Sequence, residues 1–190
     1  RWHITGHLNG GYLAAVCGQV ASEALGGAAP FTISTHYLAP ARGAGPADVD
    51  VEVLREGRLS TARVRLSREG TTLLESLVTT GTPKAHAALR EDAPPPAIPE
   101  WDDLPSADET PFSAQEGNEV LRHVDLRLDP GDAAALSGGA ALDRAVARGR
   151  MVYRDGSPAD LFLASAAWDL LPPTPWFVHI WTGAPTVAAQ

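Results

Sequence analysis

The first candidate for chemistry in this sequence is a single carboxylate within an apolar run. Asp169 lies in LFLASAAWDLL, residues 161–171, where its neighbours along the chain are apolar or small. An unpaired carboxylate in such surroundings is costly, so we expect Asp169 to be held by specific partners or to face a cavity, where it could accept a proton. The alternative is an exposed acid near a helix end, and the run alone does not decide between the two.

A second candidate is the group Asn9, Gly10 and Gly11, which leads into a predicted helix. Glycines at this point let a ligand approach the backbone N–H groups at the positive end of the helix dipole, which would suit a carbonyl oxygen or a phosphate. The alternative is that Asn9 caps the helix and the glycines allow it to pack closely on its neighbours. The Asn-Gly-Gly sequence is compatible with both.

Other reactive side chains are scattered. Arg63 and Arg65 alternate with apolar residues, which is typical of the solvent-exposed face of a strand. Arg58 is therefore the arginine that keeps a candidate role in anion binding. The histidines have no spacing typical of a metal or catalytic site, and no GxSxG motif is present. The single Cys17 has no partner for a disulfide or a zinc cluster, so we expect no metal and no cofactor.

The elements that must position these residues are clearest in the first half. The segment GYLAAVCGQVASEAL (11–25) predicts a mostly buried helix that ends at Gly26 and Gly27. Ser22 should lie off the buried face of this helix. The buried face should carry Leu13, Val16, Cys17, Val20 and Ala24. Four strands follow, and an antiparallel meander around the helix is the simplest topology. In the second strand the valines alternate with acids, which predicts one buried and one wet face. The predicted strands are 31–38, 47–56, 59–69 and 71–80.

The second half repeats this pattern. Strands are predicted at 120–128 and 145–154, and a helix at 159–171 with Pro158 in its first turn and Pro172 and Pro173 as its stop. Only FVHIW and PTVAA follow this helix, so by repeat logic the second unit lacks about 40 to 60 residues. A first strand is also expected to be missing before Trp2. We therefore expect a fragment or an incomplete second unit.

An acidic, proline-rich segment separates the halves. Nine acidic residues and no Lys or Arg lie between residues 91 and 119, which accounts for the net charge of −8. We predict an extended, solvated linker at 89–117, pinned to a folded surface by Trp101 and Leu104. The predicted units are thus 1–88 and 118–190.

Composition excludes several classes of protein. With 44% hydrophobic residues, 190 residues can bury a core. Outside the acidic segment the charges nearly balance, so no nucleic-acid footprint is predicted. No apolar run of membrane-spanning length and no signal peptide is recognisable, which favours a cytoplasmic location without a membrane span.

The order and spacing of several segments resemble acyl-CoA thioesterase II-like (TesB-like) proteins along nearly the whole chain. The resemblance is carried by LNGGYLAAVCGQVASEAL, FTISTHYLAPARGAG, VDVEVLREGRLSTARVRLSREG and TTLLESLVTTG in the first half, and by RGRMVYRDGSPAD, LASAAWDLLPP and GAPTV in the second. It implies an α+β double hotdog, in which two long helices are each wrapped by an antiparallel sheet and acyl-CoA binds between the units. Further pairing into a homo-oligomer is possible in such proteins.

The resemblance also implies roles for particular residues. Asp169 matches the catalytic aspartate that positions or activates water, and Thr186 matches a threonine that binds the same water. His36 matches a strand near the ligand tunnel, although a core histidine explains it equally well, and the resemblance includes the turn around Arg58. The family's glutamine has no counterpart here, since Gln190 does not lie at that position. Several aromatic residues are candidates for a tunnel lining or for core: Tyr12, Tyr37, Trp168, Trp176 and Trp181.

The function implied is hydrolysis of acyl-CoA to a free acid and CoA by an activated water. An acyl-CoA-binding or scaffold protein without turnover is the alternative, and a hotdog hydratase is a third, disfavoured because no histidine accompanies Asp169 in sequence. The sequence does not indicate the acyl chain length.

Overall fold

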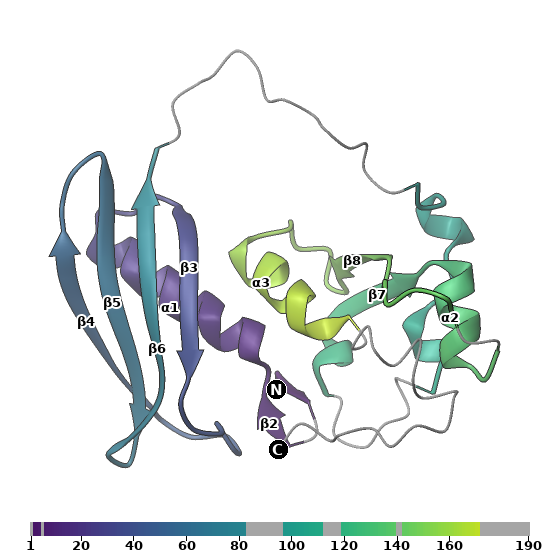
Figure 1. Cartoon of the computed structure of the whole chain (residues 1–190), viewed down its shortest axis with the longest axis horizontal. Helices are drawn as coiled ribbons and strands as arrows, with labels where there is room; N and C mark the ends of the chain where they lie inside the picture. Colours follow the sequence, from purple (N-terminus) through teal and green to yellow (C-terminus); the bar gives the residue numbers. More distant parts are fainter. Residues whose placement is uncertain (1, 5, 83–96, 112–118, 140–141, 172–190) are drawn as a thin grey trace.

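The computed structural model describes residues 2–4, 6–82, 97–111, 119–139 and 142–171, without the side chains of Phe162 and Trp168. The chain has an α+β fold in which helix α1 (Gly10–Ala24) lies against one face of a four-stranded sheet (Figure 1). The strands are β3 (Pro30–Tyr37), β4 (Asp48–Arg55), β5 (Leu59–Arg68) and β6 (Thr71–Gly81). A short pair, β1 (His3–Ile4) and β2 (His7–Leu8), precedes α1.

Helix α1 begins and ends where its sequence predicts. Asn9 caps it by accepting a hydrogen bond from the Tyr12 N–H (2.7 Å), and Gly26 and Gly27 adopt positive φ angles of 88° and 85° after it. The predicted buried face was partly wrong, because Ala24 is exposed whereas Ser22 is buried and donates to the Ala28 carbonyl. The buried residues are Leu13, Ala15, Cys17, Gly18, Ala21 and Ser22.

The four strands are antiparallel in the order β3-β6-β5-β4. The predicted meander is therefore correct for β4, β5 and β6 only, because the last strand also pairs with β3 and places β3 and β4 at opposite edges. The core beneath α1 is formed mainly by alternate residues of the two central strands. The alternate residues are Ala62, Val64, Leu66, Leu74 and Val78, and Leu73, at a shift in the β5–β6 register, joins them.

Strand β4 departs from the predicted burial. Val49 and Val53 are 37% and 43% exposed, and only Val51 is half-buried on the face that the alternation predicts to be buried. The physical reason is position, since β4 is an edge strand with a neighbour on one side only. Alternation thus predicted the strand correctly but not the depth at which it lies.

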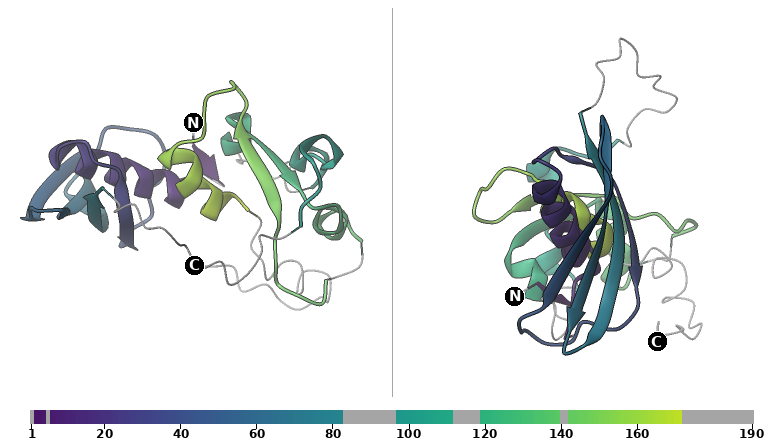
Figure 2. Two further views of the ribbon diagram at one scale, coloured as in Figure 1. Left: turned by 90° about the horizontal axis from the view of Figure 1, so that it is seen from above. Right: turned by 90° about the vertical axis from the view of Figure 1, so that its left-hand side faces the viewer.

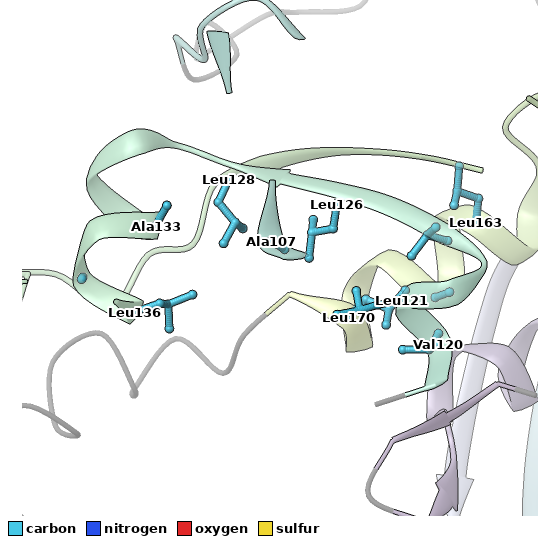
Figure 3. Packing of buried hydrophobic residues seen from close by; sticks show 12 residues of the cluster. Ala107, Val120, Leu121, Leu126, Leu128, Ala133, Leu136, Leu163 and Leu170 are labelled. Atoms are coloured by element: carbon cyan, nitrogen blue, oxygen red, sulfur yellow. The ribbon is translucent and has the colours of Figure 1, made fainter. Parts of the chain in front are cut away.

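The second half forms a separate core around a two-stranded antiparallel sheet, β7 (Val124–Leu128) and β8 (Gly149–Tyr153), with helix α3 (Leu161–Leu170) against it. Figure 3 shows the leucines of this core converging from β7, α3 and the short helix η3 (Glu119–Arg122). Its largest fully buried members include Leu126, Leu128 and Leu170. No helix in the described part of the chain has the length and apolar character needed to cross a bilayer.

The segment 97–111, which lies within the predicted linker, packs on this second core, whereas an extended and solvated segment was expected. It contains two short helices, η1 (Trp101–Asp103) and η2 (Ala107–Glu109), and Ala107 is 1% exposed within the core. Leu104 is 3% exposed, as its predicted pinning role requires, and Trp101 is partly buried beneath the Arg127 guanidinium, 4.6 Å from the ring centroid. Burial of its few apolar residues, together with the hydrogen bond from the Leu128 N–H to the Pro105 carbonyl and the ion pair of Asp108 with Arg154, thus holds the acidic segment on the protein.

Helix α2 (Pro130–Leu136) was not predicted. Asp129 caps it by accepting from the Gly131 N–H, and Pro130 occupies its first position. Asp132 is fully buried and accepts from the Arg148 backbone N–H at 2.7 Å, while the Arg148 side chain forms ion pairs with Asp129 and Asp132. This buried carboxylate is satisfied by its partners and has a structural explanation.

Helix α3 is shorter than the predicted span of 159–171. It begins at Leu161 because Asp160 caps it by accepting from the Leu163 N–H (2.9 Å), so Pro158 lies before the helix and not in its first turn. The predicted stop residues Pro172 and Pro173 lie outside the described residues. Helices α1 and α3 run antiparallel and in contact, as Figures 1 and 2 show, with Gly10 beside Asp169 and Gly18 beside Leu161.

A stack of aromatic rings also joins the two halves. The Trp2 ring stacks on Tyr12 of α1 and on His123, with ring centroids 5.7 and 4.9 Å apart, and Tyr153 of β8 meets it edge-on. These contacts fix the N-terminal end of α1 against the second core. The same end of α1 carries the candidate site.

Candidate active site

A cavity of about 690 Å³ lies between strand β3 and the pair of helices α1 and α3. Its volume is within the range of small-molecule sites in proteins. One wall is formed by β3, whose residues 31, 33, 35 and 37 all line it, and the other by residues of both helices. The lining residues are Gly10, Gly11, Ala14, Pro30, Phe31, Thr32, Ile33, Thr35, Tyr37, Leu161, Ala164, Ser165 and Asp169.

Asp169 lies at the polar end of this cavity. Its Oδ2 atom accepts hydrogen bonds from the Gly10 N–H at 2.6 Å and from the Gly11 N–H at 3.4 Å. The carboxylate therefore lies at the N-terminus of α1, where the helix dipole and the free N–H groups favour an anion. Among the described residues, nothing forms a hydrogen bond to its second oxygen, Oδ1.

The sequence left two alternatives for Asp169, a carboxylate held by partners at a cavity and an exposed acid, and the structure combines parts of both. It has specific partners and faces the cavity, but it is exposed and not buried among apolar neighbours. The reason is the orientation of α3, which turns Leu163, Ala166 and Leu170 into the second core and leaves Asp169 on the side of α1.

Glycines make this contact between helices possible. A Cβ atom on Gly11 would lie 2.0 Å from the Ser165 carbonyl oxygen and 2.9 Å from the Ala166 Cα, so only glycine allows the backbones to approach this closely. Asn9 is 2% exposed and its side-chain oxygen serves the helix cap. The capping and packing roles of the Asn-Gly-Gly group are thus present, together with two N–H groups that hold an anionic oxygen.

Tyr37 completes the polar end. Its hydroxyl donates a hydrogen bond of 2.6 Å to the Gly10 carbonyl, and a Cβ atom on Gly10 would lie 3.1 Å both from this hydroxyl and from the Asp169 Oδ2 atom. Desolvation by burial, followed by the nearby Asp169 carboxylate, raises the pKa of Tyr37 to about 12. The hydroxyl therefore keeps its proton well above neutral pH.

The opposite end of the cavity is apolar. Phe31, Ile33 and Leu161 line it, and Ala14 and Ala164 leave space between β3 and the helices because their side chains are small. We call the end lined by Phe31, Ile33 and Leu161 the apolar arm. The cavity thus combines one anchored carboxylate with this apolar arm. Such a site can place a polar reacting group at Asp169 and an aliphatic chain along β3.

Two other residues predicted for the site, His36 and Arg58, lie elsewhere. His36 is exposed and alternates with cavity-lining residues 35 and 37, which places it on the other face of β3. Arg58 is exposed in the turn between β4 and β5 and does not line the cavity. Thr186 lies outside the described residues, as do Trp176 and Trp181. Across the described ranges, no group of three His, Cys, Asp or Glu side chains is arranged to hold a metal ion.

Sequence reasoning missed the role of Tyr37 at this site. Tyr37 was a candidate for tunnel lining or core only, because the partner of its hydroxyl is a backbone carbonyl of α1, which the packing of α1 against β3 brings near. The available signal was the alternation of residues 31, 33, 35 and 37, which places Tyr37 on the face that includes Ile33.

Comparisons with known proteins agree with the fold of the chain. Residues 1–82 match the family described as the acyl-CoA thioesterase N-terminal domain. Among solved structures, a protein of Thermobifida fusca YX provisionally named thioesterase II is 31% identical, with a TM-score of 0.77 over 92% of this chain and 64% of that one. A provisionally named thioesterase of Novosphingobium aromaticivorans DSM 12444 is 26% identical, with a TM-score of 0.73 over 94% of this chain and 65% of that one.

A third structure shows the fold alone. It is a protein of unknown function with a hot dog fold from Alicyclobacillus acidocaldarius, 18% identical, with a TM-score of 0.76 over 96% of this chain and 64% of that one. The chain thus spans 64% to 65% of the length of these three proteins. No curated protein sequence gives a significant match.

The fold and these matches define the class of protein, a hotdog-fold relative of thioesterases. Within that class, the resemblance to acyl-CoA thioesterase II-like (TesB-like) proteins that the sequence indicates is confirmed.

Proposed function

We propose that this protein hydrolyses acyl-CoA thioesters to a free carboxylic acid and CoA by means of a water molecule activated by Asp169. The observation that carries the proposal is the Asp169 carboxylate, anchored by one oxygen on the Gly10 and Gly11 N–H groups at the polar end of a cavity with an apolar arm. The relatives named for thioesterase activity support the substrate class.

In the proposed reaction, Asp169 accepts a proton from the water as the water oxygen attacks the thioester carbonyl carbon. The carbon–sulfur bond then breaks, and the sulfur of CoA leaves with a proton returned by the carboxylic acid. Because one oxygen of Asp169 is held by N–H groups, the other is left to accept from water. Thr186 is proposed to bind the same water.

The acyl chain is proposed to extend along β3 between Phe31, Ile33 and Leu161. Burial of a chain on these side chains contributes about 0.8 kcal/mol per methylene group, so affinity should rise with chain length until the apolar arm is filled. The CoA portion would leave through the open side of the cavity.

We further propose a double hotdog, in which α1 and α3 are equivalent helices of two related units, 1–88 and 118–190, joined by 89–117. An offset of 151 residues relates the helix caps Asn9 and Asp160, each of which accepts from the N–H three positions ahead. The same offset relates Gly18 to Asp169. The same offset relates Gly10 to Leu161, so the contact between Gly10 and Asp169 should have a counterpart between Leu161 and Gly18. This counterpart is also present. This reciprocity supports a pseudo-twofold axis between the helices.

The proposal is tested by a thiol-release assay of the full-length protein on short-, medium- and long-chain acyl-CoAs, paired with calorimetric binding of the same compounds. We expect turnover that depends on chain length. Binding without turnover on every chain length would replace the proposal by a non-catalytic acyl-CoA-binding protein, and absence of both would refute the substrate class.

A further inference from the structure

The start of helix α1 contains a chain of hydrogen bonds that leads from β3 to the carboxylate. The Tyr37 hydroxyl donates to the Gly10 carbonyl at 2.6 Å, and the Gly11 N–H on the other side of the same peptide group donates to Asp169 Oδ2 at 3.4 Å. A hydrogen bond accepted by a peptide carbonyl polarises that peptide and strengthens the bond that its N–H donates. Tyr37 is therefore linked to Asp169 through one peptide group.

From this geometry we propose that Tyr37 is a positioning residue for the reaction, which acts on Asp169 through the Gly10–Gly11 peptide. This inference rests on the proposed function. Its hydroxyl adds a second restraint on that peptide in the first turn of α1, where two consecutive glycines make the helical backbone easier to deform. The N–H groups at the start of α1 then remain aimed at the carboxylate, and Asp169 keeps its place in the lining of the cavity.

A further feature favours this role over that of a simple wall residue. Tyr37 is 53% exposed and lines the cavity, so its ring contributes little to the core between the sheet and α1, whereas its hydroxyl donates a short hydrogen bond to the Gly10 carbonyl.

The chain offers a matched control. The Tyr153 hydroxyl donates to Asp160 Oδ1 at 2.6 Å, at the start of α3, so it serves a helix N-terminus over the same distance but does not contact Gly10, Gly11 or Asp169. Tyr37→Phe and Tyr153→Phe therefore each remove one hydroxyl and one hydrogen bond of equal length.

The experiment is a double-mutant cycle on the full-length protein, with kcat and KM measured on a turned-over acyl-CoA. We expect Tyr37→Phe to lower kcat about threefold to tenfold, the range for loss of one such bond, with KM changed less than about twofold. In an Asp169→Asn background the same change should have no further effect, because the group through which it acts is gone. Tyr153→Phe should leave kcat within about twofold of wild type.

An equal loss of kcat from Tyr37→Phe in both backgrounds, or no loss in the wild-type background, would overturn the inference. A second arm needs no turnover: the amide resonance of Gly11 in the ¹⁵N-labelled protein should shift in Tyr37→Phe and not in Tyr153→Phe. If the wild type hydrolyses no acyl-CoA, the proposed function fails, and the Gly11 shift alone decides whether Tyr37 acts on this peptide.

Discussion

The contact between α1 and α3 leads to a sharp prediction about two glycines of one helix. Gly11 and Gly18 both face α3, but a Cβ atom on Gly11 would meet backbone, 2.0 Å from the Ser165 oxygen and 2.6 Å from the Ser165 carbonyl carbon. On Gly18 it would meet only the ends of flexible side chains, 2.7 Å from Ile33 Cδ1 and 3.0 Å from Leu161 Cδ2. The two substitutions therefore differ in what must move.

For Gly11→Ala the helices must separate by about 1 Å or more, because non-bonded carbon atoms approach comfortably to about 3.5 Å. We expect a loss of about 1–3 kcal/mol in the free energy of unfolding, as for other overpacked sites. The same separation would lengthen the bond of 2.6 Å between the Gly10 N–H and Asp169, so turnover should fall as well. For Gly18→Ala, the gain of about 1 kcal/mol in helix propensity should offset much of the side-chain adjustment.

Chemical denaturation of the wild type and both variants measures this difference directly. Gly11→Ala should unfold at a lower denaturant concentration than Gly18→Ala, with similar m-values. Equal stability of the two variants, or a more stable Gly11→Ala, would refute the close backbone contact and with it the placement of Asp169.

Three other predictions follow from named contacts. Asp160→Ala removes the cap of α3 and should lower the free energy of unfolding by about 0.5–2 kcal/mol in denaturant titrations, whereas a neutral effect would contradict the cap. Leu128→Ala, at a fully buried site of the second core, should cost about 2–5 kcal/mol in the same assay, and a cost below about 1 kcal/mol would show that this core is not packed as described. Burial and the nearby Asp169 carboxylate raise the pKa of Tyr37 to about 12, against a usual value of about 10, so its contribution to stability is complete below pH ~10 and is lost as the pH rises toward ~12. The melting temperature of wild type should therefore fall relative to that of Tyr37→Phe over that interval, and a constant difference would contradict the raised pKa.

The sequence predicted the local elements of the first half well because their signals are local. The predicted bounds of the helix at 11–25 and of the four strands differ from the structure by at most one residue at each end, since caps, glycine stops and alternation depend on neighbouring residues only. The order of the strands was not accessible in this way. Whether β6 pairs with β3 depends on contacts between distant residues, and so does the exposure of Val49 and Val53 on the edge strand.

The second half shows where short signals mislead. Asp129-Pro130-Gly131 is typical of a turn, yet here it begins helix α2, because Asp129 caps the helix and the alanines that follow have high helix propensity. The acidic segment likewise contains few apolar residues, and its packing depends on where Leu104 and Ala107 meet the second core.

The sequence singled out some residues of the candidate site but not its geometry. The cost of a carboxylate in an apolar run indicated Asp169, and helix-cap chemistry indicated Asn9, Gly10 and Gly11. That the Asp169 carboxylate binds the N–H groups of those same glycines follows only from the antiparallel contact of two helices about 150 residues apart in sequence. Assignment of Thr186 remains a prediction.

The most direct test of the central claim is the turnover number of Asp169→Asn on the acyl-CoA that the wild type hydrolyses fastest. The amide is nearly the same size and its oxygen can still accept from the Gly10 N–H, but it cannot take a proton from water. We predict a fall in kcat of about 100-fold or more, with the dissociation constant for the acyl-CoA changed only slightly. A kcat within about threefold of wild type would contradict the account, because the anchored carboxylate would then not be the group that activates water.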